Sequence, residues 1–422
     1  MRILILHRIP YHKIDYHRGI DHDRHEVTYV GTAAALANIP ESLNCRKLER
    51  PGLGKTMDEV IALIEQQQLE FDRILSLSEY ELLDAAHIRQ RFSITGPTPA
   101  QVDKVRNKVI MKAMVAAAGI RVPEFLPLSK LEQLPKWHDP VVVKPIDGAS
   151  SENVKVFSSI NSLLSAIQAR NTGIELLDRE IPDFVQFEVE EFIQGQIVHF
   201  DGLVQDGEVK VVLASQYVGD CLGYANGQPL GSVQIDISNE DRAWASQVLS
   251  AVELQQGSFH LEAIASNSGL VFLEVANRVG GADVVDTFAL ATGIHLPSVE
   301  LKIWLGEQLQ LPQTANSIGQ KFGWYVFPGH HYQADYCRIS GHDRFRNHPF
   351  VIHWQQLSPE QKLPRHITYQ AIEVPLAGIV GGNSSESLQN FLQELFAQVQ
   401  IEPLGSPVSV VEADDATQPC LL

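Results

Sequence analysis

The stretch GSFHLEAIASNSGLVFLEVANRVGGADVVDTFALATGIHLPSVELKIWLG, residues 257–306, decides the fold. Two apolar runs, FHLEAIA and LVFLEVA, flank the turn-forming residues 266–269, so the stretch predicts a β-hairpin followed by a glycine pair and a helix. Such a hairpin places Glu262 nearly opposite Glu274. Carboxylates within apolar runs need a compensating cation, and hard oxygen ligands suit Mg²⁺ held together with phosphates. Two solvated glutamates on an edge hairpin are the alternative for this stretch taken alone.

A lysine upstream lies on a predicted helix that suits such a site. Residues 98–123 form a helical pattern that ends at Gly119 and is followed by a proline. Lys108 shares one face of this pattern with Lys104 and Lys112, because the three recur every four residues. Phosphate contact by Lys108 is one interpretation, and a solvated basic stripe is the alternative.

A second lysine follows a predicted strand. Lys144 comes directly after the β-branched run 141–143, which is typical of a buried strand, and precedes a flexible loop. The loop residues that offer hydrogen-bond donors are Gly148, Ser150, Ser151 and Asn153. A point charge at the mouth of a buried strand, beside backbone N–H groups, suits polyphosphate binding.

Residues 184–216 supply a third element. Their sequence, FVQFEVEEFIQGQIVHFDGLVQDGEVKVVLASQ, predicts a strand, an acidic hinge, a glycine and two strands around a turn. The order of features, from the two lysines through the Glu-Glu-Phe-Ile hinge to the two glutamates and Arg278, resembles the ATP-grasp superfamily of carboxylate–amine ligases. The resemblance covers roughly the middle half of the chain, residues 98–306, and depends on several weak motifs occurring in the right order.

The resemblance implies a role for each matched residue. The residues implied to bind ATP are Lys108, Lys144, Gly148, Ser150, Ser151 and Asn153 around the phosphates, and Glu190, Glu191, Phe192 and Ile193 at the adenine hinge. The residues implied to bind metal are Glu262, Glu274 and Asn277, and those implied in catalysis are Arg278, Gly280 and Gly281. The implied cofactors are ATP and Mg²⁺, with two ions in the site and Mn²⁺ as an alternative metal.

Two positions depart from the pattern of that superfamily. Many members place a ribose-binding glutamate just after the hinge glycine, whereas residues 195–201 read GQIVHFD. Members also often carry Glu-x-Asn, with the asparagine as a metal ligand, whereas Asn277 stands one position later than that spacing requires. The sequence therefore does not identify the residue that contacts the ribose. Asn277 either binds the metal from its shifted position or leaves the metal without that ligand.

The pattern Glu-x-x-x-Arg-x-Gly-Gly at residues 274–281 looks most like the branch that joins amino acids into dipeptides, which includes ligases of dapdiamide-type antibiotic biosynthesis. The resemblance implies an ATP-dependent ligase that activates a small carboxylic acid or amino acid as an acyl phosphate. The activated acid then couples to the amine of an amino acid. Two alternatives stay open: a formate- or bicarbonate-using enzyme of the purine or biotin-carboxylase type, and a noncatalytic nucleotide-binding protein.

The chain as a whole reads as mixed α/β. Strand and helix patterns alternate at the start, which predicts a small parallel α/β domain over residues 1–97. The resemblance implies an ATP-grasp domain over residues 98–310, with a lid at about residues 120–186 and a central antiparallel sheet. Further strand patterns and one amphipathic helix predict a small C-terminal α/β domain over residues 311–422.

Composition restricts the classes of function. A net charge of −18 over 422 residues argues against nucleic-acid binding, which needs a basic surface. The widely spaced cysteines, Cys45, Cys221, Cys337 and Cys420, argue against structural zinc and a disulfide framework, so a cytoplasmic location is expected. The sequence shows neither a signal-peptide pattern nor an apolar run of about 18 residues, so no membrane partner is expected. The predicted partners are small-molecule acid and amino-acid substrates, and a homodimer is compatible with the sequence.

Two patterns near the N-terminus resemble a P-loop and a metal site, but neither has the required spacing. The run GLGKT at residues 52–56 lacks the first glycine of a P-loop, because that position is Glu49. Thr56 with Glu59 instead predicts a capping box at a helix start. A group of histidines has spacing that matches no zinc site, so substrate contact or solvation is expected. These histidines are His7, His12, His17, His22 and His25.

Overall fold

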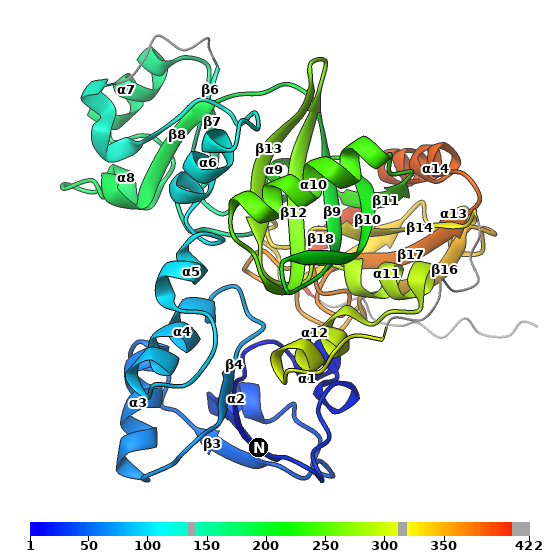
Figure 1. The fold of residues 1–422 in the computed structure, drawn as a ribbon. Coiled ribbons are helices and arrows are strands. Elements are labelled where there is room, and N and C mark those ends of the chain that lie inside the picture. The colour runs from blue at the N-terminus through cyan, green and yellow to red at the C-terminus, as the bar shows by residue number, and fades with distance from the viewer. Residues whose placement is uncertain (134–139, 311–318, 407–422) are drawn as a thin grey trace, which may run out of the picture.

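The computed structural model describes residues 1–133, 140–310 and 319–406 (Figure 1). Within these ranges the chain forms an N-terminal α/β unit, a small lid and a large sheet. Figure 1 shows the lid at the upper left, the N-terminal unit at the bottom and the large sheet at the right. The mixed α/β fold expected from the sequence is confirmed.

The N-terminal unit is built on a four-stranded parallel sheet in the order β3-β2-β1-β4. Alternate residues of β1 serve two cores, because successive side chains of a strand point to opposite faces. Ile3 and Ile5 pack among tyrosines on one face, and Leu4 and Leu6 pack under α3 and α4 on the other. The elements are β1 (Arg2–Leu6), α1 (Tyr11–Ile14), β2 (Glu26–Gly31), α2 (Ala33–Leu36), β3 (Arg46–Glu49), α3 (Thr56–Gln66), β4 (Arg73–Leu75) and α4 (Leu82–Arg91).

Glu59 fills the loop that resembles a P-loop. Its carboxylate accepts hydrogen bonds from the backbone N–H groups of Gly52, Leu53 and Gly54, at 2.9, 2.8 and 2.7 Å. The capping-box prediction is wrong, because α3 has Lys55 at its N-cap with no side-chain cap bond and Glu59 turns back to the loop instead. A phosphate would have to displace this carboxylate from the backbone donors.

Two of the five N-terminal histidines, His7 and His22, are buried as polar members of the tyrosine-lined core, whereas His12 and His17 are exposed and His25 is half-buried. His7 Nε2 lies 3.2 Å from Asn38 Oδ1, and His22 Nε2 lies 2.9 Å from the hydroxyl of Tyr29. Within the part of the chain that the structure describes, none of the five histidines belongs to a group with metal-ligand spacing. Packing and local hydrogen bonding therefore account for His7 and His22.

The single helix expected to carry three lysines is in fact two helices, α5 (Pro99–Asp103) and α6 (Lys108–Ala117). The side chain of Asn107 accepts hydrogen bonds from two backbone N–H groups of the first turn of α6, which starts a new helix there. The predicted solvated stripe is wrong as a result. Lys104 lies outside both helices and partly exposed, whereas Lys112 is completely buried.

The lid is a four-stranded antiparallel sheet in the order β5-β8-β6-β7, covered by helices. Val141, Val143 and Val189 face its apolar core. The alternation of a strand therefore sends Lys144 and Glu190 to the opposite face. The elements are β5 (Phe125–Pro127), η2 (Leu128–Gln133), β6 (Val141–Pro145), β7 (Lys155–Phe157), α7 (Ile160–Ala169), α8 (Glu175–Asp178), η3 (Phe184–Gln186) and β8 (Phe187–Glu191).

The large sheet has eight strands in the order β13-β12-β9-β10-β11-β14-β17-β16. The predicted strands after the hinge and the predicted hairpin are confirmed as β9 and β10 and as β12 and β13. The elements of its first half are β9 (Gln196–Gln205), β10 (Glu208–Val218), α9 (Cys221–Ala225), β11 (Leu230–Ile235), α10 (Asn239–Ala251), β12 (Gln256–Ser266), β13 (Gly269–Ala276), α11 (Val284–Thr292) and α12 (Leu296–Trp304).

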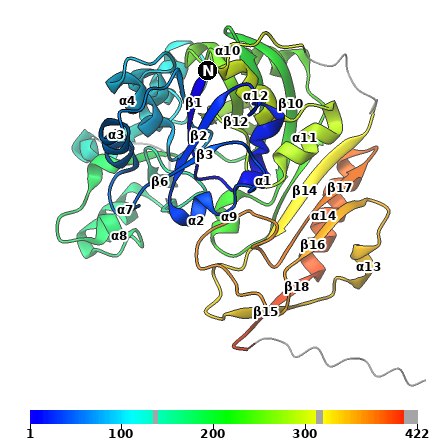
Figure 2. The same cartoon turned by 90° about the horizontal axis from the view of Figure 1, so that it is seen from below.

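The C-terminal strands extend this same sheet, and Figure 2 shows them running alongside it. A two-stranded ribbon of β15 and β18 lies beyond them. The elements are β14 (Lys321–Phe327), β15 (Tyr336–Ser340), α13 (Asp343–Arg346), β16 (Val351–Gln356), β17 (Leu376–Gly382), α14 (Ser385–Gln398) and β18 (Gln400–Leu404). Because β11 pairs directly with β14, a domain boundary at residue 310 stays a prediction.

Three of the four cysteines lie in the described ranges. Cys45, Cys221 and Cys337 are free thiols, and Cys420 lies outside the described residues. Among the described helices, none combines the length and the apolar character that crossing a bilayer requires.

Candidate active site

The hairpin brings the two predicted carboxylates together. Its register pairs Glu262 with Glu274, and a β-bulge directly after Glu262 shifts the register there, as bulges do beside functional sites. The hydroxyl of Tyr217 donates to Glu262 Oε1 at 2.7 Å, and Lys108 Nζ lies 3.0 Å from Glu274 Oε2. Burial would raise the pKa of Glu274, but Lys108 and Lys144 outweigh it and lower that pKa to about 2. Glu274 is therefore ionised at neutral pH.

Beside this hairpin, Lys144 of the lid and Lys112 of α6 form a buried ion-paired cluster with Glu188 and Glu190. Lys144 Nζ lies 2.6 Å from Glu190 Oε1, and Lys112 Nζ lies 2.7 Å from Glu188 Oε1. Lys112 also contacts Glu190. Burial would lower the pKa of Lys144, but Glu190, Glu188 and Glu274 raise it above the ordinary lysine value. The surrounding carboxylates thus favour the charged form of Lys144 although its side chain is buried.

Lys112 and Glu188 are site residues that the sequence analysis did not identify. Glu188 and Glu190 alternate with the buried residues Phe187 and Val189, so both carboxylates share the face of β8 opposite to the lid core. That alternation was a usable signal. It shows that the two glutamates need basic partners on a neighbouring element.

The four predicted hinge residues divide between two environments. Glu190 faces the lysines, whereas Glu191, Phe192 and Ile193 line a cavity of about 310 Å³. Residues 266–268, at the tip of the hairpin, line the same cavity. The segment after β8 therefore borders an open space, while the carboxylate of Glu190 is directed elsewhere.

The predicted phosphate loop has an unusual backbone. Ser150, Ser151 and Asn153 adopt φ values of 59°, 54° and 58°, a left-handed region that non-glycine residues seldom enter. Strain of this kind gathers at ligand-binding loops. Lys108 Nζ donates to the carbonyl of Gly148 at 2.7 Å, so the first residue of α6 is tied to this loop.

Arg278 reaches the N-terminal unit. Its Nε donates to Glu79 Oε2 at 2.5 Å, and its Nη1 donates to the carbonyl of Val279 at 2.7 Å. Glu79 also contacts Arg106, whose Nη2 donates to the carbonyl of Asp147 in the lid at 2.7 Å. Burial would raise the pKa of Glu79, but Arg278 and Arg106 outweigh it and lower that pKa. Sequence analysis missed Glu79, although it follows a parallel strand, where ligand-facing residues gather.

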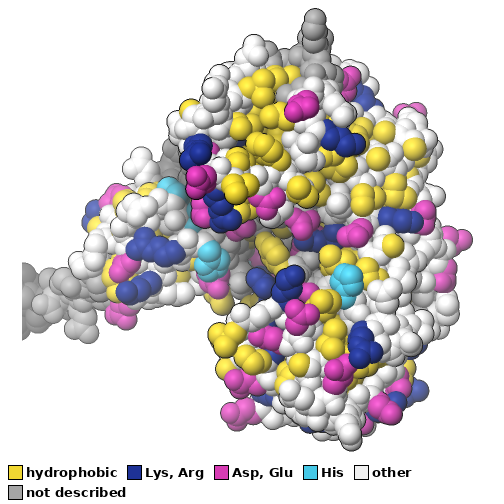
Figure 3. Space-filling view, turned by 90° about the vertical axis from the view of Figure 1, so that its left-hand side faces the viewer, with side chains coloured by type: hydrophobic (Ala, Val, Ile, Leu, Met, Phe, Trp, Pro, Cys, Tyr) yellow, Lys and Arg dark blue, Asp and Glu magenta, His cyan; other side chains and the backbone are white. Residues whose placement is uncertain are grey.

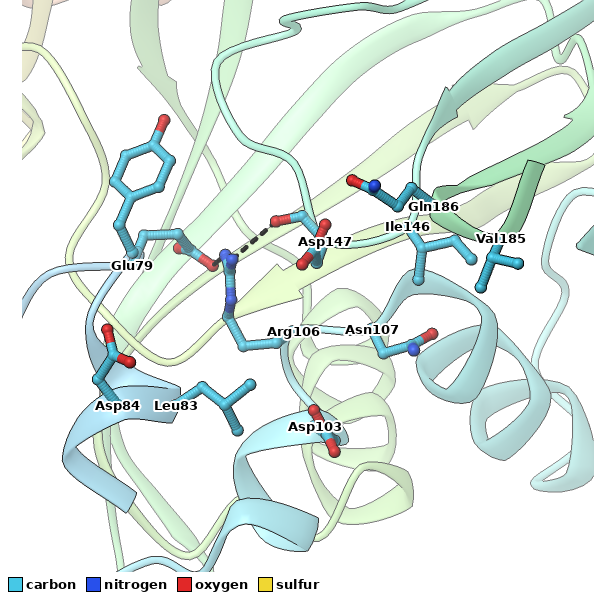
Figure 4. Close-up of a pocket in the computed structure, with 11 residues that line it drawn as sticks. Glu79, Leu83, Asp84, Asp103, Arg106, Asn107, Ile146, Asp147, Val185 and Gln186 are labelled. Atoms are coloured by element: carbon cyan, nitrogen blue, oxygen red, sulfur yellow. Dashed lines mark hydrogen bonds and ion pairs between the residues drawn. The ribbon is translucent and has the colours of Figure 1, made fainter. Parts of the chain in front are cut away.

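These contacts border a cleft between the N-terminal unit and the lid. Figure 3 looks onto that side, and basic and acidic side chains gather around the hollow between the upper and lower parts. Figure 4 shows Glu79, Arg106 and Asp147 converging in the cleft, which has a volume of about 330 Å³. Glu79 and Arg106 both line this cleft, so their ion pair forms part of its wall.

The residues after β13 have distinct surroundings. A Cβ on Gly280 would lie 2.9 Å from Asp201 Oδ1, whereas a Cβ on Gly281 would meet nothing within 4 Å. Close packing thus requires glycine at 280, and space is open at 281. Asn277 Nδ2 donates to the carbonyls of residues 256 and 258 at 3.1 and 2.8 Å, near the start of β12 and away from Glu262. The amide nitrogen of Asn277 is thus bound to the backbone of β12, and its role as a metal ligand stays a prediction.

A row of buried polar side chains along one face of the large sheet reaches Glu262, and the sequence analysis missed it too. Asp201 Oδ2 lies 2.6 Å from His199 Nδ1, and Asp201 Oδ1 lies 2.7 Å from His260 Nδ1. At its ends, His260 Nε2 lies 3.3 Å from Glu262 Oε1, and His199 Nε2 lies 2.7 Å from Ser232 Oγ. Burial would lower the pKa of His260, but Asp201 and Glu262 raise it to about 10.

Comparison with characterised sequences identifies relatives of this chain. It is 28% identical over 270 residues to the L-arginine-specific L-amino acid ligase of Bacillus subtilis, which covers 61% of this chain and 63% of that protein. It is 27% identical over 190 residues to dapdiamide A synthase of Enterobacter agglomerans, covering 42% and 43%. Both matches span less than two thirds of the relative's own length.

Comparison of folds agrees with this result. The crystal structure of an L-amino acid ligase from Bacillus licheniformis superposes with a TM-score of 0.70 at 18% identity, covering 96% of this chain and 98% of that one. An N5-carboxyaminoimidazole ribonucleotide synthetase in complex with ADP superposes with a TM-score of 0.64 at 13% identity, covering 93% and 96%. Residues 137–286 match the ATP-grasp domain family. The chain therefore carries an ATP-grasp domain and has the ATP-grasp fold.

Proposed function

We propose that the protein is an ATP-dependent carboxylate–amine ligase that forms an amide or dipeptide and releases ADP and phosphate. The observation that carries the proposal is the convergence of Glu262, Glu274, Lys108, Lys144 and Arg278 on one side of an ATP-grasp fold. The named relatives, an amino acid ligase and a dapdiamide synthase, favour amino-acid substrates over formate or bicarbonate.

Glu262 and Glu274 suit a divalent cation such as Mg²⁺. They are hard oxygen donors in register on adjacent strands, and Glu274 is ionised with its side chain 31% exposed. These two carboxylates would hold the ion, which would supply charge neutralisation for the transferred phosphoryl group. We further propose two ions, with Mn²⁺ able to replace Mg²⁺.

Lys108, Lys144 and the loop at residues 148–153 are proposed to hold the triphosphate. Lys108 already bonds to this loop, and each lysine lies against a carboxylate, Glu274 for Lys108 and Glu190 for Lys144. The triphosphate would take the place of these carboxylates as the lysines' partner. The cavity beside Glu191 is proposed to receive the adenine.

The reaction requires two displacements. An oxygen of the acid attacks the terminal phosphorus of ATP and ADP leaves, which gives the acyl phosphate. The amine nitrogen then attacks the acyl carbon, phosphate leaves with the bonding electrons, and the nitrogen loses a proton. Arg278, held by Glu79, is proposed to bind the acyl phosphate and the oxyanion, and the open space at Gly281 admits the reacting group. Small acids and amino acids are the proposed substrates. We also propose that the protein is cytoplasmic and forms a homodimer.

ADP release from pairs of amino acids and small acids, with products identified by mass spectrometry, tests the proposal. ADP should form only when both an acid and an amine are present, and the mass of the product should equal the sum of the two substrates minus one water. The Glu274→Gln variant is the matched control, because it keeps the shape of the side chain and removes the charge that the metal requires.

Two results would contradict the proposal. ADP formation with bicarbonate or formate as the only acid accepted would place the protein with the purine or biotin-carboxylase enzymes. Tight nucleotide binding without ADP release for any pair would mark it as a binding protein.

A further inference from the structure

The row of buried polar side chains on the large sheet is built by strand register. His199 and Asp201 alternate on β9, and His260 and Glu262 alternate on β12, so all four lie on one face. The register pairs His260 with Asp201 and Glu262 with His199. Exposed fractions of 1%, 3% and 7% for His199, Asp201 and His260 remove them from solvent.

Contacts from Tyr217 and His260 fix the position of the Glu262 carboxylate. Both contacts to that carboxylate, from the Tyr217 hydroxyl at 2.7 Å and from His260 Nε2 at 3.3 Å, are made to Oε1. Two contacts to one oxygen set the plane of the carboxylate and leave Oε2 for a cation. His260 can hold this position because Asp201 anchors its other ring nitrogen at 2.7 Å.

The same aspartate packs against the loop that follows Arg278. A Cβ on Gly280 would lie 2.9 Å from Asp201 Oδ1, so the loop backbone and the carboxylate are in close contact. Asp201 thus supports the hairpin through His260 and the glycine loop directly. A shift of Asp201 would therefore displace both the hairpin and the glycine loop.

We propose that Asp201 and His260 are positioning residues that orient Glu262 for the metal ion of the bound nucleotide. The inference rests on the proposed function. Side chains that hold a metal ligand from behind commonly change metal affinity 10- to 100-fold when replaced. Neither residue touches the ion or the substrate in this role.

A metal ion held by His199, Asp201 and His260 themselves is the competing explanation, since one ligand atom from each lies within 4.8 Å of the others. The distances favour hydrogen bonds. Asp201 oxygens lie 2.6 and 2.7 Å from the two Nδ1 atoms, whereas ligand atoms about 2.1 Å from a shared ion would lie roughly 3 Å or more apart. The two histidines therefore bond to the aspartate and not to an ion.

The test measures Mn²⁺ binding by electron paramagnetic resonance, with a nonhydrolysable ATP analogue present, so that no turnover is needed. Asp201→Asn and His260→Gln should each weaken Mn²⁺ affinity roughly tenfold, while affinity for the analogue without metal stays unchanged. Glu300→Gln is the matched control. Glu300 is a carboxyl buried against β12 that bonds to Trp304 and does not contact Glu262, so its replacement should leave Mn²⁺ affinity unchanged.

Circular dichroism establishes which variants fold. If Asp201→Asn does not fold, His260→Gln decides the question. Wild-type Mn²⁺ affinity in a folded variant would overturn the inference, and so would stoichiometric zinc in the wild-type protein that is lost in His260→Gln. Failure of the wild-type protein to bind Mn²⁺ with the analogue would instead refute the proposed function, and the inference with it.

Discussion

Replacing Lys112 by methionine tests the buried ion-paired cluster directly. Methionine keeps the length and the apolar stem of lysine and removes only the charge and its donors. Lys112 is completely buried and is the close partner of Glu188, at 2.7 Å, and a second partner of Glu190. In the variant the two carboxylates would share Lys144, which lies 4.0 Å from Glu188.

The expected loss of stability follows from this geometry. Removing one partner of a buried ion pair leaves an uncompensated charge and destabilises by about 3–5 kcal/mol. Glu188 is 0% exposed, and its Oε2 has no hydrogen-bond partner among the described residues, so water cannot replace the lysine. The free energy of unfolding should therefore fall by roughly 3 kcal/mol or more.

Chemical denaturation followed by circular dichroism measures this quantity. Lys104→Met is the matched control, because Lys104 pairs with a half-exposed glutamate, Glu253, and such surface pairs contribute about 1 kcal/mol or less. Adding Glu188→Gln to Lys112→Met should restore part of the lost stability. If Lys112→Met and Lys104→Met lose the same small amount, the buried cluster does not exist in solution.

Three further outcomes are expected. Arg278→Lys should lower kcat much more than it raises the KM for ATP, because a single ammonium group cannot both keep the bond from Nε to Glu79 and bind an oxyanion. Steady-state kinetics measures both constants, and a normal kcat would show that the proposed role is wrong. Lys144→Met should weaken ATP binding more than tenfold, about 1.4 kcal/mol, and an unchanged Kd by calorimetry would exclude phosphate contact. Burial raises the pKa of Glu300 to about 7, above its unfolded value, so its contribution to stability is present below pH 4.5 and is lost as the pH rises through 7. Glu300→Gln should therefore reduce the loss of unfolding free energy between pH 5 and pH 8 by about 3 kcal/mol, and parallel pH profiles for the two proteins would contradict this.

Local features of the sequence predicted the hairpin and the strands that flank the hinge. Alternating apolar residues and turn residues act over a few positions, so the pairing of Glu262 with Glu274 follows once the turn is located. The break between α5 and α6 was equally local. It depends on the capping side chain of Asn107, a signal that was present and was overlooked.

The missed residues acquire their roles through distant partners. Lys112 lies 76 residues before Glu188, and Glu79 lies 199 residues before Arg278. A lysine spaced like a surface residue on a helix cannot be told from a buried one until the strand that faces it is placed. Asp201 was likewise given no role, because its partner His260 comes 59 residues later.

The pairing within the cluster and between Lys108 and Glu274 accounts for six charged side chains, all buried except the half-buried Glu274, that would otherwise oppose folding. Lys108, Lys112 and Lys144 face Glu188, Glu190 and Glu274, three charges of each sign. On the proposed function, Glu274 would exchange Lys108 for a cation while Lys108 would exchange Glu274 for a phosphate oxygen. Each buried group would keep an opposite charge beside it throughout, so binding would avoid most of the desolvation that an unpaired charge suffers. Lys112 would keep its two carboxylate partners both with and without bound nucleotide. On this view Lys112 stabilises the fold, whereas Lys108 binds the nucleotide.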